Sequence, residues 1–425
     1  MPAPSKRLLP DTSPASSRLQ RLQGAARKIV VRLRPYAWIW PPIAFGAGVA
    51  SFFLVERQQW LGAVLALGML LAWVLLLSEN LISRLLRKRG LNVSPQGATA
   101  FIAQMIHQET LFFCLPFLLA TTVWSSGQAI FTLLITAMAL LSILDPFYYR
   151  LAQRHRWLYF AFHAQCVFVV VLVTLPIMLK LTTDQSLIVA LLVMTVFAIP
   201  SLFRLLKPGS LLRWTGMLGL LVALAGAAWV GRAWVPPASL WLTGSALSPA
   251  FDIQARSPFG SMALTDKQVS QNGLFAYTAI RAPRGLHETI YHEWYQEGEL
   301  VDRIPLMIRG GREEGYRAWT HKRNFPESPA GNWRIEVVTP LGQRLGVMRF
   351  HVSDAASGAA RADGRIRSPG GIPGLDLRRL IAGQRAVPEQ KSVPLSETAK
   401  GIEPEIEVTE DHAGKQQSRN PTSGK

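Results

Sequence analysis

Long apolar runs fill residues 36–235 of the chain, and a two-residue alternation of apolar and polar positions replaces them further on. About 20 helical residues at 1.5 Å each match a hydrocarbon core of about 30 Å. The third apolar run, Thr110–Trp124, is short, and an amphipathic run at 98–107 could extend its helix toward the N-terminus. Residues 36–235 are therefore predicted to form an α-helical polytopic membrane domain of about seven transmembrane helices, at Tyr36–Val55, Trp60–Ser78, Thr110–Trp124, Gln128–Leu144, Trp157–Leu179, Ser186–Leu206 and Leu212–Val235.

The alternation after residue 274 is typical of β-strands whose two faces differ in polarity. Short segments rich in aromatic and β-branched residues are separated by Gly and Pro turns such as Gly310-Gly311 and Pro340-Leu341-Gly342. Residues 274–353 are predicted to form a small all-β antiparallel sandwich, immunoglobulin-like, after a 236–273 linker with room for its first strands. The expected strands are Leu274–Arg281, Glu288–Gln296, Glu299–Arg309, Tyr316–Arg323, Asn332–Thr339 and Arg344–Val352.

The two ends of the chain follow neither pattern. Residues 1–35 begin Pro- and Ser-rich, and Arg18–Arg34 then places leucines on one helical face and basic side chains on the other, as in a helix lying on anionic headgroups. A short apolar core with a cleavage site does not follow, so a signal peptide is not expected. Residues 354–425 lose the alternation, fill with Gly, Pro, Ser and Arg, and are predicted to be a disordered tail.

The basic residues determine the expected orientation. The net charge is +18, yet many Lys and Arg residues adjoin the apolar runs, where they act as topology determinants instead of forming a nucleic-acid surface. With the N-terminus cytoplasmic, the outer loops hold only Arg57 and Lys180. The inner segments hold the amphipathic helix and Arg84, Arg87, Lys88, Arg89, Arg150, Arg154, Arg156, Arg204, Lys207 and Arg213. The β-domain is thus expected outside the membrane, in the periplasm.

Polar residues inside the predicted spans are candidates for function. His163 and Gln165 lie within the fifth span and could contact a polar headgroup or substrate, or form a satisfied interhelical hydrogen bond. His107 precedes the third span, where interfacial solvation accounts for it. Cys114 and Cys166 both fall inside spans and are expected to be small packing residues.

Several segments of the C-terminal part carry a family resemblance. They are HEWYQEGE from His292, GYRAWTHK from Gly315 and GNWRIEVVTPLGQRLGVMRFHV from Gly331. Over 274–352 the chain resembles the bacterial domain of unknown function DUF2914, which shows a His-x-Trp strand, an Arg-x-Trp strand and a Gly-x-Trp strand ending in Phe-x-Val. The part before it resembles uncharacterised multi-span regions fused to that domain. The resemblance implies a location and a fold and brings no known activity.

The same strands supply the candidate ligand-binding residues. These are His292, Trp294, Arg317, Trp319, His321 and Trp333. On one interpretation they form a platform where rings stack on sugars and Arg holds a carboxylate or phosphate. On the other, the tryptophans fill the core and Arg and His close its edge.

Enzymatic and metal chemistry find little support. The stretch HETIYH has one residue too many for the His-Glu-x-x-His spacing of zinc proteases, and no Ser, Cys or Thr lies in a nucleophile motif. No catalytic residue, metal or cofactor is predicted.

These observations predict an integral inner-membrane protein of a Gram-negative bacterium that presents a periplasmic β-sandwich as a binding or interaction module. Its expected partners are the lipid bilayer and an envelope glycan, an anionic lipid or another envelope protein, with no nucleic acid. The alternatives are a membrane transporter or an envelope-processing enzyme with the β-domain as an accessory.

Overall fold

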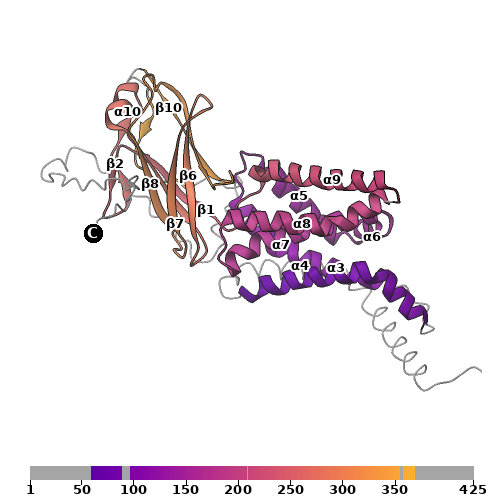
Figure 1. Ribbon diagram of the computed structural model, residues 1–425. Helices are drawn as coiled ribbons and strands as arrows, with labels where there is room; N and C mark the ends of the chain where they lie inside the picture. The colour runs from indigo at the N-terminus through magenta and orange to yellow at the C-terminus, as the bar shows by residue number, and fades with distance from the viewer. Residues whose placement is uncertain (1–58, 89–95, 208, 355–357, 369–425) are drawn as a thin grey trace, which may run out of the picture.

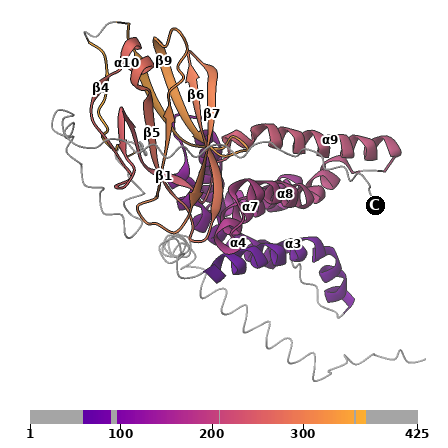
Figure 2. The same cartoon turned by 60° about the vertical axis from the view of Figure 1, so that its left-hand side comes forward.

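The computed structural model describes residues 59–88, 96–207, 209–354 and 358–368. The described chain has two parts, a helical region (residues 59–234) and a β region (residues 241–368). The helices run side by side, and the β region sits at one end of them (Figures 1 and 2).

The helical region contains several helices long and apolar enough to cross a membrane. Within the described residues there are five, or up to six if one bent pair counts as a single span. The elements are α3 (Gln59–Lys88), α4 (Gln96–Thr121), α5 (Gln128–Ile143), α6 (Asp145–Arg154), α7 (Arg156–Met178), α8 (Thr183–Leu206), α9 (Leu211–Val230) and the short 3-10 helix η2 (Gly231–Trp234).

Three predicted spans need comment. The first, Tyr36–Val55, lies outside the described residues, as does the amphipathic segment Arg18–Arg34. The third begins earlier than the apolar run alone suggested, because α4 starts at Gln96 and carries buried polar residues through its first half. The fourth is α5, which ends before Leu144, where the chain turns by 95° into α6.

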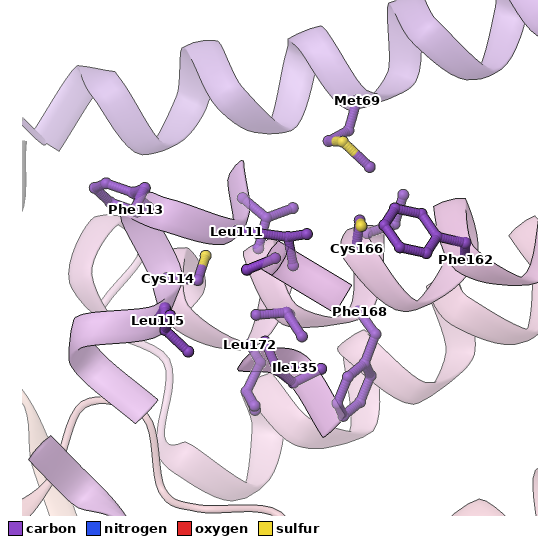
Figure 3. Close-up of a cluster of buried hydrophobic side chains, with 14 of the residues drawn as sticks. Met69, Leu111, Phe113, Cys114, Leu115, Ile135, Phe162, Cys166, Phe168 and Leu172 are labelled. Atoms are coloured by element: carbon purple, nitrogen blue, oxygen red, sulfur yellow. The ribbon is translucent and has the colours of Figure 1, made fainter. Parts of the chain in front are cut away.

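The bundle is built around α7, which packs against α3, α4, α6 and α8. Its buried side chains join those of α3, α4 and α5 in one apolar cluster. Figure 3 shows Met69 pointing from α3 toward Phe162 and Cys166 of α7. As predicted, Cys114 and Cys166 are buried and free in this core. Helix α9 packs along α8 and buries none of its own residues.

The β region holds two main antiparallel sheets. One has the order β1-β5-β8 and the other β10-β9-β6-β7, with two small pairs, β2-β3 and β11-β4. The strands are β1 (Trp241–Ser248), β2 (Ala250–Asp252), β3 (Ser257–Phe259), β4 (Met262–Ala263), β5 (Leu274–Arg281), β6 (His287–Gln296), β7 (Glu299–Arg309), β8 (Tyr316–Lys322), β9 (Gly331–Val338), β10 (Arg344–Val352) and β11 (Arg361–Ala362), with helix α10 (Asp266–Asn272) between β4 and β5.

Alternation along the strands explains how the two sheets share one core. In β6, Ile290, His292 and Trp294 are buried, whereas Tyr291 and Glu293 face the other way. Apolar side chains from both main sheets meet in a single buried cluster. The six strands expected from the sequence occur within one residue of their predicted bounds.

Strands also form in two segments that the sequence assigned to other roles. Residues 236–273, expected as a linker, contain β1, which pairs along the full length of β5. Residues 358–368 belong to the predicted tail, yet β11 pairs with β4 and Arg367 bridges to Ser245 of β1. The rest of the predicted tail, residues 369–425, lies outside the described chain.

Hydrogen bonds join the β region to the end of the helical region, and we call this contact the junction. The turn between β9 and β10 enters it, since Gln343 donates its side-chain N–H to the Val235 carbonyl (3.1 Å) and the Arg232 guanidinium donates to the Leu341 carbonyl (3.1 Å). Leu341 also packs against the apolar cluster of the helices. The junction therefore combines apolar packing with buried polar contacts.

Candidate functional site

A chain of hydrogen-bonded polar rings lies inside the helical region. His107 of α4 is 2.8 Å from the hydroxyl of Tyr148 through Nδ1 and 2.8 Å from Nδ1 of His163 through Nε2. The Tyr148 hydroxyl lies 2.9 Å from that of Tyr159 on α7. All four side chains are fully buried. We call this set, His163–His107–Tyr148–Tyr159, the polar chain.

Aromatic and apolar neighbours enclose the polar chain. The Phe162 ring lies 5.2 Å from that of His107, and the Phe197 ring stacks on His163 at 5.9 Å. In a region that excludes water, a linked set of donors and acceptors avoids the large penalty of isolated polar groups. The Nε2 atom of His163 is nevertheless buried, and no described residue forms a hydrogen bond with it.

A buried ion pair lies at the end of the helices away from the junction. Arg156, the first residue of α7, pairs with Glu79 of α3, which is 3% exposed. Thr99 of α4 donates its hydroxyl to the same carboxylate at 2.7 Å. Burying a carboxylate is tolerated only when it is paired and hydrogen-bonded. The Glu79 contacts thus tie three helices together.

Two glutamines of α4 hold the break between α5 and α6. Gln104 donates to the Ser142 carbonyl (2.9 Å) and to the Asp145 carboxylate (2.7 Å), and Gln108 donates to the Ser142 carbonyl (2.6 Å). These contacts satisfy a carbonyl freed where α5 ends. They fix the start of α6, which carries Tyr148 into the polar chain.

The structure separates the two intramembrane candidates of the sequence. His163 belongs to the polar chain, whereas Gln165 is half-buried and outside it. His107 was assigned to the interface, which is wrong because α4 begins at Gln96 and places it within the helix. The available signal was the spacing of Gln104, His107 and Gln108, which lie on one helical face.

Three of the β-region candidates lie in the core. Trp294 and Trp333 are at most 1% exposed, and their rings lie 6.5 Å apart. His292 is fully buried between the hydroxyls of Thr278 (3.1 Å) and Thr320 (2.9 Å) on the facing sheet. Burial lowers the pKa of His292 to about 3, so its ring is neutral near pH 7. These three residues stabilise the fold, and of the three only Trp333 also borders the groove described below.

The other three candidates share the outer face of β8. Trp319 stacks with Phe251 of β2 at 4.3 Å, and His321 stacks with Phe275 at 3.9 Å. Arg317 donates to the Ala255 carbonyl at 3.1 Å. The structure thus brings together an aromatic cluster with an arginine, as the platform interpretation expected, but the β2-β3 pair already packs against it.

A basic groove of about 560 Å³ lies at the far end of the other sheet. It is open to solvent, and Arg349 on its wall is exposed with no ion pair among the described residues. Arg349 of β10 supplies its unpaired positive charge, since its cross-strand neighbour Arg334 of β9 forms an ion pair with Glu336 at 2.8 Å. Its lining includes Glu297, Asn332, Arg334, Arg349, Phe350 and His351. We call it the basic groove.

A carboxylate is buried at the junction. Glu288 of β6 is 4% exposed and accepts hydrogen bonds from the backbone N–H (3.1 Å) and hydroxyl (2.9 Å) of Thr183, the first residue of α8. Burial raises the pKa of Glu288 to about 7, and the Thr183 hydrogen bonds oppose that rise. The junction therefore contains a group that titrates near neutral pH.

Comparison with known families gives two matches. The model of a family of unknown function, DUF5924, matches residues 19–276, and the model of a protein of unknown function, DUF2914, matches residues 287–352. No curated protein and no solved structure matches the chain. The resemblance to DUF2914 is confirmed. The two matched segments meet inside the β region, since the first reaches β5 and the second begins at β6.

Proposed function

The chain belongs to the family of unknown function DUF5924, and from that premise we propose that it is an integral inner-membrane protein that presents its β region in the periplasm as a binding module. In this proposal the helices anchor the module and set its orientation. The basic groove takes an anionic partner. No catalytic role is assigned to the β region.

The distribution of basic residues supports the orientation. In the described helical region only Lys180 and Arg232 lie at the junction end. The other Lys and Arg residues gather at the opposite end, at Arg84, Arg87, Lys88, Arg150, Arg154, Arg156, Arg204, Lys207 and Arg213. Loops rich in Lys and Arg remain in the cytoplasm. The junction and the β region then face the periplasm.

The number of crossings agrees with this orientation. Helices α3, α4, α5, α7, α8 and α9 alternate between the basic end and the junction end. The sequence predicts a further crossing at Tyr36–Val55, outside the described residues, and with it the N-terminus would lie in the cytoplasm. The short helix α6, turned by 95°, then lies along the cytoplasmic surface with its basic residues in the headgroups.

The strand order supports an immunoglobulin-like sandwich. Sheets β1-β5-β8 and β10-β9-β6-β7 correspond to strands A-B-E and G-F-C-C′ of that fold. Such modules commonly act by binding through their surfaces instead of by catalysis, although the fold alone does not determine function.

The basic groove is the observation that carries the binding role. It lies at the end of β6 away from the junction, and ten strand residues at about 3.3 Å each place it about 30 Å from the helices. An anionic polymer of the envelope, such as the carboxylate-rich cell wall, suits both the position and the charge.

A co-sedimentation experiment tests this role. The detergent-solubilised full-length protein is mixed with purified cell-wall sacculi, and the bound fraction is compared with that of Arg349→Glu. Arg309→Glu serves as the matched control, because Arg309 is equally exposed but lies at the junction end of β7. We expect Arg349→Glu alone to reduce binding severalfold. Equal binding by all three proteins, or no binding by the wild type, would refute the role.

A further inference from the structure

Two buried ring nitrogens in the helical region have no hydrogen-bond partner among the described residues, and the ring of one phenylalanine lies beside both of their rings. They are Nε1 of Trp73 on α3 and Nε2 of His163 on α7. The Phe197 ring of α8 lies 4.7 Å from the Trp73 ring and 5.9 Å from the His163 ring. An unsatisfied polar group in hydrocarbon costs several kcal/mol, so two beside one ring require an explanation.

The position of these groups points toward the bilayer. Helices α3 and α8 pack on either side of α7, and Trp73 and Phe197 are only half-buried. The neighbouring side chains of both outer helices, Leu70, Val74, Leu192 and Val196, are apolar and exposed. A molecule dissolved in the bilayer could therefore reach the two nitrogens by displacing the Phe197 ring.

The polar chain determines what His163 can offer. Donation from Nε2 of His163 requires one of the two directions open to these hydrogen bonds: Tyr148 donates to Nδ1 of His107, and Nε2 of His107 donates to Nδ1 of His163, so that Nε2 of His163 carries a proton. His163 then presents an N–H donor, as Trp73 always does. Hydrogen-bond donors in an apolar setting match oxygens that only accept hydrogen bonds.

The depth of His163 in the bilayer limits which lipophilic oxygen acceptors can reach it. His163 lies seven residues after Arg156, the start of α7, which is about 10 Å along the helix axis. Ester carbonyls of phospholipids stay at the edge of the hydrocarbon core, whereas a free lipophilic carbonyl compound can enter it. We propose that the helical region binds a quinone-type lipophilic carbonyl from the bilayer through Nε2 of His163 and Nε1 of Trp73, with Phe197 as the displaceable cover.

Two substitutions of His163 test the roles of its two ring nitrogens separately. Asparagine keeps a polar atom at the Nδ1 position facing His107 and removes the outward donor, whereas glutamine places an amide N–H near the position of Nε2. We expect His163→Asn to weaken binding about tenfold and His163→Gln to stay within about threefold of the wild type, consistent with the loss or retention of one buried hydrogen bond.

The measurement uses the full-length protein in lipid nanodiscs and a 1,4-benzoquinone with a decyl tail as the probe. Binding is followed by quenching of tryptophan fluorescence, and Trp73→Phe should remove a quenched component that Trp214→Phe, on α9, leaves intact. In a second experiment, methyl decanoate, an ester on a chain of similar length, is added to the protein with the quinone. The ester should not reduce the quenching. Thermal unfolding checks that each variant is folded.

The proposal fails if folded His163→Asn binds the quinone as tightly as the wild type. It likewise fails if methyl decanoate reverses the quenching caused by the quinone. It also fails if Trp73→Phe and Trp214→Phe show the same quenching. Should His163→Asn not fold, Trp73→Phe still decides, because this variant loses one donor and leaves the polar chain untouched.

Discussion

Replacing Glu288 by glutamine should remove a pH dependence from the junction. A carboxyl whose folded-state pKa is raised from 4.5 to about 7 favours the folded state fully only below pH 4.5. That contribution is lost as the pH rises through about 7, and at 1.36 kcal/mol per pKa unit the loss is about 3 kcal/mol. Glutamine cannot ionise, and its carbonyl can still accept a hydrogen bond from Thr183.

Thermal unfolding of the full-length protein in detergent between pH 5 and pH 8 tests this reasoning. At pH 5 the two proteins should have similar midpoints. At pH 8 Glu288→Gln should unfold roughly 3 °C higher, because an unfolding entropy of about 2.1 cal/mol/K per residue over 425 residues gives about 1 °C per kcal/mol. Glu299→Gln is the control, because Glu299 is exposed at the far end of the sheet. If the unfolding midpoints of the wild type and of Glu288→Gln fall by the same amount between pH 5 and pH 8, the Glu288 carboxyl does not carry the effect.

Three further predictions concern the β region. His292→Leu should destabilise it by about 1–3 kcal/mol in thermal unfolding, because two buried threonine hydroxyls lose their partner. Gly310→Ala should lower the melting temperature clearly, since a Cβ there would lie 1.8 Å from a backbone carbonyl, and should do so more than Gly216→Ala on α9, where nothing lies within 4 Å and φ is not positive. Residues 287–352 alone should lack a folded circular dichroism spectrum, whereas 236–368, which restore β1 and β5 to the core, should give one.

The strands were predictable because most of them alternate apolar and polar positions, as half-buried strands do. Each strand from β5 to β10 has an apolar face that the shared core requires, and the turns between them carry Gly or Pro. Strand β1 was harder to place, because the surrounding Pro, Ser and Gly resemble a linker. Its pairing with β5 depends on a contact that spans about 30 residues of sequence.

The candidate sites were predicted less well, because they depend on register and on helix bounds. His107 reaches the polar chain only because α4 starts a dozen residues before the apolar run. The basic groove arises where Arg349 and Arg334 pair across two strands. Trp294 and Trp333 could equally have faced a ligand or the core, and only the pairing of the two sheets places them inside.

Labelling of single introduced cysteines with a membrane-impermeant maleimide tests the orientation of the protein most directly. Leu300→Cys lies on an exposed part of β7, and Arg150→Cys on the exposed face of α6, while Cys114 and Cys166 are buried and should remain unlabelled. In spheroplasts we expect Leu300→Cys to react at once and Arg150→Cys to react only after lysis. Reaction of Arg150→Cys before lysis, with Leu300→Cys protected, would contradict a β region on the periplasmic side.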